Sequence, residues 1–333
     1  MPTQVPEIVG VDAASFEERV VAPFAPVVLR GLAADWPAVV AARRSDEALA
    51  DYLTSLDSGR PAQLFIGPPE IHGRFFYNQA LTGCNFQTRA APLGALLRHL
   101  LSTRDKPDMD ALYAGAAATD EHLPAWSANN PLPFAIPTAR ARVWVGNRTH
   151  VATHFDEASN IAVVVAGRRR FTLFPPEQMD NLYVGPLHLT IAGPPVSMVD
   201  CERPDFAAYP RFAEAWRHAQ VAELEPGDAL YIPPIWWHDV RALAPFNVMV
   251  NHWWEEEAAV SPLGALKKTL RAVRDLPHAH RRAWRHWFNR FVFDDDAAQA
   301  ADHLPEQARG LVGPPSTARD AFLAAQDRAE QGK

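Results

Sequence analysis

Two distant parts of the sequence carry residue types that can bind a metal ion. The first contains His154 and Asp156, separated by one residue. Side chains alternate between the two faces of a β-strand, so a His-x-Asp triplet in a strand directs both groups to one side and Phe155 to the other. The second part, residues 225–254, supplies His238 after a Gly-Asp turn and the short apolar strand expected at Ala229–Ile232.

Two imidazoles and one carboxylate can hold a metal ion from one side and leave its opposite positions open. Non-haem Fe(II) oxygenases use this ligand set, because the open positions accept a co-substrate and O₂. Manganese or nickel could use the same ligands, and the alternative without a metal is three hydrogen-bonded structural residues. We assign His154, Asp156 and His238 as metal ligands and catalytic residues because of the segments that surround them.

These surrounding segments resemble one known family. They are HFDE at 154–157, GRRRFTLFPP at 167–176 and PGDALYIPPIWWH at 226–238. Together they are similar to the cupin-like, JmjC-related Fe(II)/2-oxoglutarate-dependent dioxygenases. That family includes the asparaginyl hydroxylase that inhibits the hypoxia-inducible factor, as well as bacterial cupin-like domain proteins. The similarity covers about residues 26–254.

The pattern of strands predicts a mainly β fold. From residue 142 to residue 254, strand-like segments recur at short spacing and are separated by Gly, Pro and Asn. This pattern is typical of a jelly roll, the double-stranded β-helix of cupins, and the resemblance implies the same core. Adjacent strands lie ~4.8 Å apart, so His238 can face Asp156 although 82 positions separate them. Helices are expected at residues 46–56 and 92–102, before the core, and a short apolar strand is expected at residues 74–77.

We expect residues 1–257 to form the catalytic domain, with an N-terminal α/β extension, and residues 258–333 to form a C-terminal helical region. In this region the second helix, 278–293, carries a stripe of Trp and Phe. The stripe is too apolar to face water, so it either packs in a core or forms a dimer interface. The resemblance implies a homodimer through the C-terminal helices. Residues 116–140 look irregular, and residues 183–222, with a helix expected at 211–220, are expected to form an insertion. Both segments are expected to set the substrate.

Composition excludes several classes of protein. The 333 residues include no apolar run of the ~20 residues that a membrane span needs, and no secretory signal is visible at the start. Only two cysteines are present, Cys84 and Cys201, which suits a reduced cytoplasm. The formal net charge of −7 argues against a general nucleic-acid binder.

The resemblance also implies contacts to 2-oxoglutarate, whose distal carboxylate requires a cation. The family places a lysine two residues after the glycine that corresponds to Gly167, and here Arg169 occupies that position. Strand alternation directs Arg169 inward with Phe171, whereas a register error of one residue would substitute Arg170. Arginine is longer and planar, so the pocket must differ in detail.

Three further positions match co-substrate contacts of the family. Tyr113 matches a tyrosine that contacts the distal carboxylate, although a buried core aromatic is the alternative. Asn160 matches an asparagine near the C1 carboxylate, and Asn251 matches one beside the metal. The sequence departs from the family at Val151, where a Ser or Thr is frequent, and Thr153 should point away.

The expected activity is that of a hydroxylase that uses Fe(II), 2-oxoglutarate and O₂ and releases succinate and CO₂. Its substrate would be a protein side chain, a peptide or a small metabolite. One alternative is a metal-binding cupin without oxygenase activity, which would act as a sensor or interaction module. A second is a tRNA-base hydroxylase, against which the acidic net charge argues.

Overall fold

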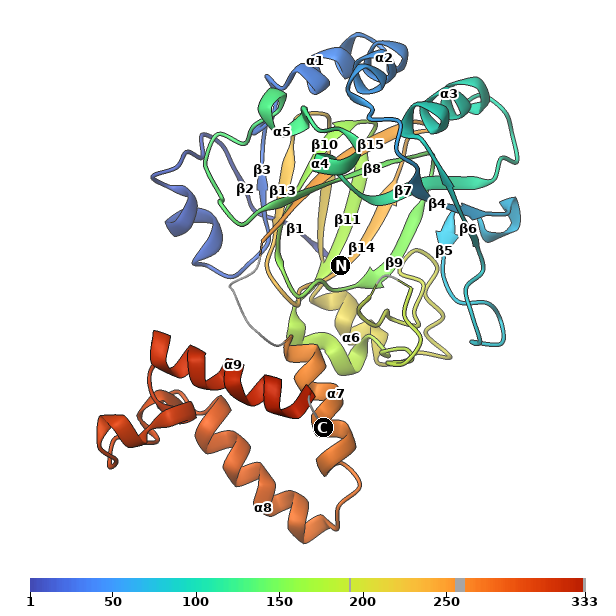
Figure 1. Cartoon of the computed structure of the whole chain (residues 1–333). Helices are drawn as coiled ribbons and strands as arrows, with labels where there is room; N and C mark the ends of the chain where they lie inside the picture. Colours follow the sequence, from blue (N-terminus) through green and yellow to red (C-terminus); the bar gives the residue numbers. More distant parts are fainter. Residues whose placement is uncertain (192, 255–260, 332–333) are drawn as a thin grey trace. The chain divides into compact units, whose positions relative to one another are not determined.

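The computed structural model describes residues 1–191, 193–254 and 261–331, and Figure 1 traces the chain. The chain divides into two compact units, Met1–Glu256 and Glu257–Lys333. The domain boundary expected at residue 257 lies within residues 255–260, outside the described residues.

Two β-sheets form the core of the first unit. The six-stranded sheet contains, in spatial order, β1 (Thr3–Gln4), β12 (Gln220–Leu224), β11 (Arg169–Phe174), β14 (Trp237–Ala242), β9 (His150–His154) and β5 (Arg74–Phe75). The nine-stranded sheet contains β2 (Glu7–Ile8), β3 (Val27–Leu29), β13 (Ala229–Ile232), β10 (Ser159–Ala166), β15 (Asn247–Trp254), β8 (Arg140–Gly146), β7 (Ala111–Ala118), β4 (Ala62–Gly67) and β6 (Gln87–Ala91). This arrangement confirms the mainly β, jelly-roll expectation.

Strand β10 shows how the sequence builds two apolar layers. Ala162 and Val164 pack into a cluster shared by both sheets, whereas Ile161 and Val163 pack into a second cluster shared with the helices. A strand buried on both faces reads as a continuous apolar run, because each face has its own core. Gly167 then turns the chain into β11 with φ of +73°, and a Cβ there would lie 2.6 Å from the carbonyl oxygen of Phe246.

Helices cover the outer face of the nine-stranded sheet. Figure 1 shows α1 (Pro37–Arg44), α2 (Asp46–Leu56) and α3 (Leu93–Thr103) grouped on one side of the sheets. The hydroxyl of Ser45 caps α2 by accepting a hydrogen bond of 3.0 Å from the backbone N–H of Ala48. Both long helices expected before the core are therefore present, within one residue of the expected limits. Short helical segments are η1 (Glu17–Val21), η2 (Pro69–Ile71), η3 (Pro176–Asn181) and α6 (Phe212–Arg217).

The expectation that residues 116–140 are irregular is wrong for their first half. Strand β7 continues to Ala118, and α4 (Thr119–His122) and α5 (Trp126–Asn129) follow. The side chain of Asn130 fixes the end of α5, accepting from the N–H of Ala38 at 3.1 Å and donating to the hydroxyl of Tyr52 at 3.0 Å. Prolines on either side made this stretch look irregular in the sequence. Tertiary contacts, not local helix propensity, stabilise these short elements.

Two other expected elements are shorter in the structure. The strand expected at residues 74–77 covers only Arg74–Phe75. The helix expected at residues 211–220 ends at Arg217, and the chain enters strand β12 at Gln220 instead.

The second unit is helical. It contains α7 (Pro262–Val273), α8 (His278–Phe288), η4 (Asn289–Phe293), η5 (Ala297–Gln299), η6 (Glu306–Ala308), η7 (Gly310–Val312) and α9 (Thr317–Gln331). Helix α8 ends five residues earlier than expected, because residues 289–293 widen into a π-helical turn. Trp284 and Trp287 are 47% and 61% exposed, so the described residues of this unit do not bury the aromatic stripe in a core. Among the described residues, no helix has the length and apolar character needed to cross a bilayer.

Candidate metal centre and co-substrate pocket

Three groups converge where β9 meets β14. His154 and His238 are direct partners across these strands, and their ring centroids lie 4.3 Å apart. Asp156 lies beyond the end of β9, so the expectation that it belongs to the strand is wrong. Its Oδ2 atom is nevertheless 3.7 Å from Nε2 of His238. Ligand atoms of all three residues lie within 4.8 Å of one another, a spacing at which one ion can contact them all.

The backbone fixes which nitrogen each histidine presents. Nδ1 of His154 lies 2.9 Å from the carbonyl oxygen of Ala152, and Nδ1 of His238 lies 2.9 Å from that of Trp236. A carbonyl only accepts hydrogen bonds, so both Nδ1 atoms carry the proton and both Nε2 lone pairs are free for a metal. Burial, with His154 nearby, lowers the pKa of His238 to about 4, so this ligand is neutral at pH 7.

The metal-free protein is expected to lose stability as the pH falls from about 6.5 to about 4. Burial lowers the pKa of both His238 and His252 to about 4, below the value of about 6.5 in an unfolded chain. The unfolded state therefore binds these protons first, so the stabilising contribution is complete above pH 6.5 and is lost through pH 4. Each shift corresponds to at most about 3 kcal/mol.

Urea unfolding with a chelator at pH 7.5, 5.5 and 4 measures this loss. The variant His252→Phe, which lies outside the metal centre, should show a shallower dependence of the unfolding free energy on pH than the parent. Equal slopes of the unfolding free energy against pH in both proteins would show that His252 does not contribute to the pH dependence.

The other face of the six-stranded sheet holds a buried polar cluster. Asp239 accepts hydrogen bonds from Nε2 of His150, at 2.8 and 2.9 Å, and from the hydroxyl of Thr153 at 3.2 Å. Thr153 precedes one histidine ligand and Asp239 follows the other. Their hydrogen bond therefore joins the two strands at the point where the ligands emerge on the opposite face.

A β-bulge accompanies this contact. The pairing of β9 with β14 shifts by one residue between the pair His238–His154 and the pair Val240–Val151. The extra residue in β9 lets Val151 and His154 both face the interior although they are three positions apart. Val151 packs against the apolar cluster between the sheets, and Thr153 points away as expected.

Replacing Asp239 with alanine is expected to weaken binding of a divalent metal by about 10–100-fold, the range typical of residues that orient metal ligands. Titration with Mn(II) or Co(II) measures the affinity. Asp200→Ala is the matched control, because the carboxylate of Asp200 pairs with Arg74 at 3.9 Å and with Arg203 at 3.7 Å and does not bind Thr153 or His150 as that of Asp239 does. Equal metal affinity in the parent and the Asp239 variant would show that the orientation of the histidine ligands does not depend on this carboxylate.

The structure separates the two arginines that the sequence left as alternatives. Arg170 is exposed and pairs with Glu223 at 2.6 Å. Arg169 is only 5% exposed, its Nε has no hydrogen-bond partner, and no carboxylate of the described residues pairs with it. Burial lowers the pKa of Arg169 to about 10, a shift that the nearby Tyr113 opposes. An unpaired buried cation is costly, so this side chain fits a bound carboxylate.

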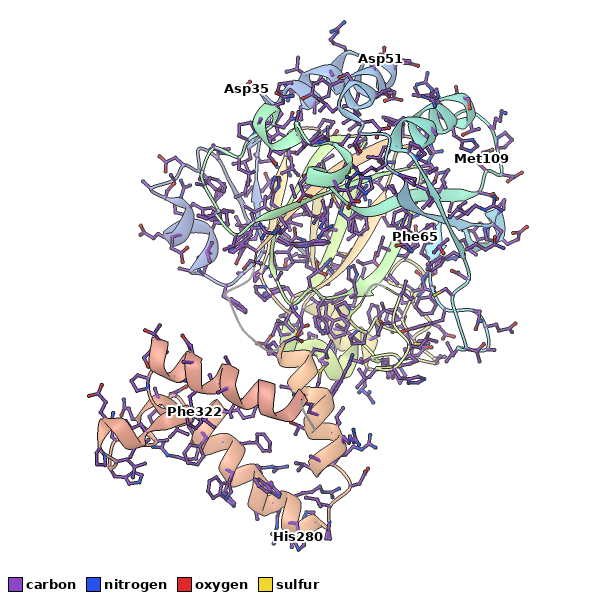
Figure 2. The ribbon with its side chains drawn as sticks, viewed as in Figure 1. Asp35, Asp51, Phe65, Met109, His280 and Phe322 are labelled. Carbon is purple, nitrogen blue, oxygen red and sulfur yellow. The ribbon has the colours of Figure 1, made fainter. Side chains whose placement is uncertain are left out.

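Tyr113 lies near Arg169 in a group of aromatic rings. Its ring stacks on Phe65 at 4.9 Å and lies edge-on to Phe75 at 4.7 Å. Phe65, a residue of strand β4, is labelled in Figure 2. Burial raises the pKa of Tyr113, so its hydroxyl stays protonated and can donate a hydrogen bond. Tyr113 is therefore a buried core aromatic, and its role as a contact to the distal carboxylate stays a prediction.

Asn160 and Asn251 face each other across β10 and β15. The side-chain amide of Asn251 donates to Oδ1 of Asn160 at 2.7 Å, and both residues are buried. Oδ1 of Asn251 has no partner, and the indole N–H groups of Trp144 and Trp253 also lack partners. Unpaired buried polar atoms are uncommon, so this set fits a polar ligand. Sequence reasoning missed Trp144. Side chains alternate along a strand, so Trp144 must face the side opposite to Val145, and this alternation was the signal that could have identified it.

Comparison with known proteins places this geometry in a family. The model of the cupin-like domain matches residues 13–259, most of the chain. The chain belongs to the cupin-like domain family. The relatives of this cupin-like protein include proteins of the JmjC group, which confirms the resemblance drawn from the sequence motifs.

Three relatives show the range of similarity. HSPB1-associated protein 1 from Rattus norvegicus is 35% identical over 154 residues, which is 43% of this chain and 30% of that protein. The tRNA wybutosine-synthesizing protein 5 from Danio rerio is 33% identical over 146 residues, 39% of this chain and 42% of that protein. Lysine-specific demethylase JMJ31 from Arabidopsis thaliana is 35% identical over 104 residues, 31% of this chain and 18% of that protein. The chain thus spans less than half the length of each. At the level of the family, these similarities support a metal-dependent, oxygenase-type role.

Proposed function

We propose that this cupin-like protein is an Fe(II)- and 2-oxoglutarate-dependent dioxygenase that hydroxylates a protein side chain or a small metabolite. The observation that carries the proposal is the combination of His154, Asp156 and His238 within 4.8 Å with a buried, unpaired guanidinium at Arg169. A metal triad alone fits many cupins. A cation without a partner in the same fold also requires an anion, and a dicarboxylate co-substrate provides one.

Iron bound at this centre would supply oxidation of a C–H bond to an alcohol, with O₂ consumed and 2-oxoglutarate converted to succinate and CO₂. The two neutral imidazoles and the carboxylate of Asp156 would hold Fe(II) from one side and leave it a net positive charge. That charge favours an anionic chelating ligand on the open side. The hydrogen bonds from Nδ1 of His154 and His238 to the backbone keep the rings oriented.

The remaining residues would position the co-substrate and limit water. Arg169 would bind the distal carboxylate through charge-assisted hydrogen bonds, with the hydroxyl of Tyr113 as a second donor. Asn160 and Asn251 would provide hydrogen bonds near the chelating end. The apolar side chain of Val151 faces the interior and helps to exclude water, which protects a reactive oxidant from side reactions.

Release of succinate tests the proposal. The protein should form succinate from 2-oxoglutarate in proportion to the O₂ consumed when Fe(II) and a substrate pool are present, and His154→Ala should form none. Tight binding of iron without any binding of 2-oxoglutarate would instead favour a metal-binding cupin that acts as a sensor or interaction module.

The proposal extends to a cytoplasmic homodimer. Trp284 and Trp287 on α8 are exposed, and Trp287 stacks on Phe291 with ring centroids 5.3 Å apart. An exposed aromatic stripe of this kind marks an interaction site. Sedimentation equilibrium of the full chain tests whether a second copy covers it.

A further inference from the structure

The helices of the second unit carry a concentrated positive charge. Residues 262–288, which contain α7 and α8, include seven Lys and Arg and a single acid, Asp275. This segment has a formal charge of +6, whereas the whole chain carries −7, so all other residues together carry −13. Three aspartates follow at 294–296, and Asp296 pairs with Arg290 at 2.6 Å, which sets the limit of the basic segment.

Most of these cations have no acidic partner. Among the described residues no carboxylate forms a salt bridge with five exposed side chains, which we call the basic set: Lys267, Arg271, Arg281, Arg282 and Arg285. The guanidinium of Arg281 donates a hydrogen bond to the backbone carbonyl of Arg274 at 2.8 Å, and its charge contributes, after the larger effect of Arg274, to lowering the pKa of Asp275. Arginines elsewhere differ: Arg217 pairs with Glu214 at 2.6 Å. Protein surfaces normally intersperse both signs of charge, so a basic set with a single acid in its segment favours a polyanionic partner.

The spacing within the basic set makes it costly without a partner. Lys267 and Arg271 are four residues apart on α7, as are Arg281 and Arg285 on α8. Like charges at this spacing destabilise a helix by about 0.2–0.5 kcal/mol per pair. A bound polyanion would remove this repulsion.

The aromatic and basic residues of α8 occupy different faces. Trp284, Trp287 and Phe291 recur at helical spacing on one face. Arg282 and Arg285 lie on the other side of the helix, and Arg281, three residues before Trp284, lies at the border between the two faces. Figure 2 shows the side chains of this unit, with His280 near the start of α8 and Phe322 on α9. The proposed homodimer would cover the aromatic face. The basic face that remains offers charge without apolar side chains, which suits a phosphate backbone better than a lipid interior.

We propose that the basic set on α7 and α8 binds the phosphate backbone of double-stranded nucleic acid. This proposal goes beyond the dioxygenase activity and departs from the expectation drawn from the net charge. The value of −7 hides two segments of opposite sign, and nucleic-acid binding depends on the local charge.

Titration of the full chain with fluorescent 20-base-pair duplex RNA and DNA, at salt concentrations from 50 to 200 mM, tests this surface. The plot of log affinity against log salt should be steep for the parent. The triple variant Arg281→Gln/Arg282→Gln/Arg285→Gln should bind more than about tenfold more weakly at 50 mM salt, and its slope should be shallower by roughly 2–3, because each lost duplex contact removes about 0.9. Comparison of RNA with DNA shows whether the backbone geometry matters.

A matched control separates local charge from net charge. The variant Arg60→Gln/Arg203→Gln/Arg217→Gln removes three exposed arginines of the first unit that pair with carboxylates, and it changes the net charge equally. It should bind like the parent. Equal weakening in both variants, or no binding of either duplex by the parent at 50 mM salt, would overturn the proposal. Stronger binding to vesicles that contain anionic lipid than to duplex would also overturn it. Self-association at low salt that is lost only when the basic set is substituted would do the same.

The dioxygenase proposal can be tested independently of this surface. The triple variant of α8 should bind Fe(II) and 2-oxoglutarate as the parent does, because its substitutions lie in the second unit. Loss of duplex binding with intact binding of 2-oxoglutarate would therefore support the role of the basic set and leave the dioxygenase proposal unaffected.

Discussion

Replacing Arg169 with methionine is expected to abolish binding of 2-oxoglutarate and to stabilise the ligand-free protein. Removing one partner of a buried charge pair typically costs 3–5 kcal/mol, which is a loss of about 100-fold or more in affinity. Without the co-substrate, the guanidinium is buried and unpaired, so its removal relieves a penalty. The two effects have opposite signs, which a general loss of folding cannot produce.

The sign of the stability change follows from the pKa. Burial lowers the pKa of Arg169 from 12.5 to about 10, so the fold disfavours the charged form. The penalty is fully present at pH 7 and is relieved only as the pH rises through about 10. The shift corresponds to on the order of 3 kcal/mol as an upper limit. Urea unfolding at pH 7 should therefore give a higher unfolding free energy for Arg169→Met than for the parent.

Calorimetric titration of 2-oxoglutarate into the Mn(II)-loaded protein measures the other effect. Arg170→Met is the matched control, because Arg170 is the exposed neighbour that pairs with Glu223. It should bind the co-substrate like the parent. Normal binding by Arg169→Met would exclude Arg169 as the anchor, and a loss in Arg170→Met would show that the inward residue has been assigned incorrectly.

Replacing either histidine of the triad with alanine is expected to weaken Fe(II) or Co(II) binding by more than about 100-fold, beyond the range seen for residues that only orient ligands. Asp156→Ala should do the same, because the carboxylate is the one anionic ligand. His122→Ala is the control, since Nδ1 of His122 contacts the carbonyl oxygen of Arg60 at 3.2 Å, away from the triad. The visible spectrum of the Co(II) protein reports both affinity and geometry.

These variants should keep their folded structure, because none of the substituted residues belongs to the apolar clusters of the core. A far-ultraviolet dichroism spectrum like that of the parent, together with lost metal binding, is the expected combination. Metal affinity within threefold of the parent in any triad variant would contradict the assignment of that residue.

Strong local patterns predicted the parts of the fold that they encode directly. The apolar run of β13 and the capped helix α2 have the limits that the sequence indicated, Ala229–Ile232 and Asp46–Leu56. The convergence of His154 and His238 followed from the antiparallel pairing of two strands in a jelly roll. The inward direction of Arg169 followed from alternation with the buried Phe171.

Features that depend on distant contacts could not be predicted in this way. The bulge in β9 breaks strict alternation, and the hydrogen bond between Thr153 and Asp239 that accompanies it joins residues 86 positions apart. The position of Asp156 outside β9 depends on a hydrogen bond from the N–H of Ile235 to its carbonyl oxygen, at 2.8 Å. Arg169 lacks a partner because none of the described residues that surround it in the folded chain provides a carboxylate, and these residues are distant from it in the sequence. No local pattern in the sequence reports these contacts.

The most direct test of the central claim is spectroscopic. The protein is reconstituted with Fe(II) without oxygen, 2-oxoglutarate is added, and the visible charge-transfer band of the iron chelate is recorded. The parent should develop the band, His154→Ala should lack it, and Arg169→Met should require far more 2-oxoglutarate to reach it. Tight binding of iron with no band at any concentration of 2-oxoglutarate would contradict the account of this site as a 2-oxoglutarate-dependent oxygenase.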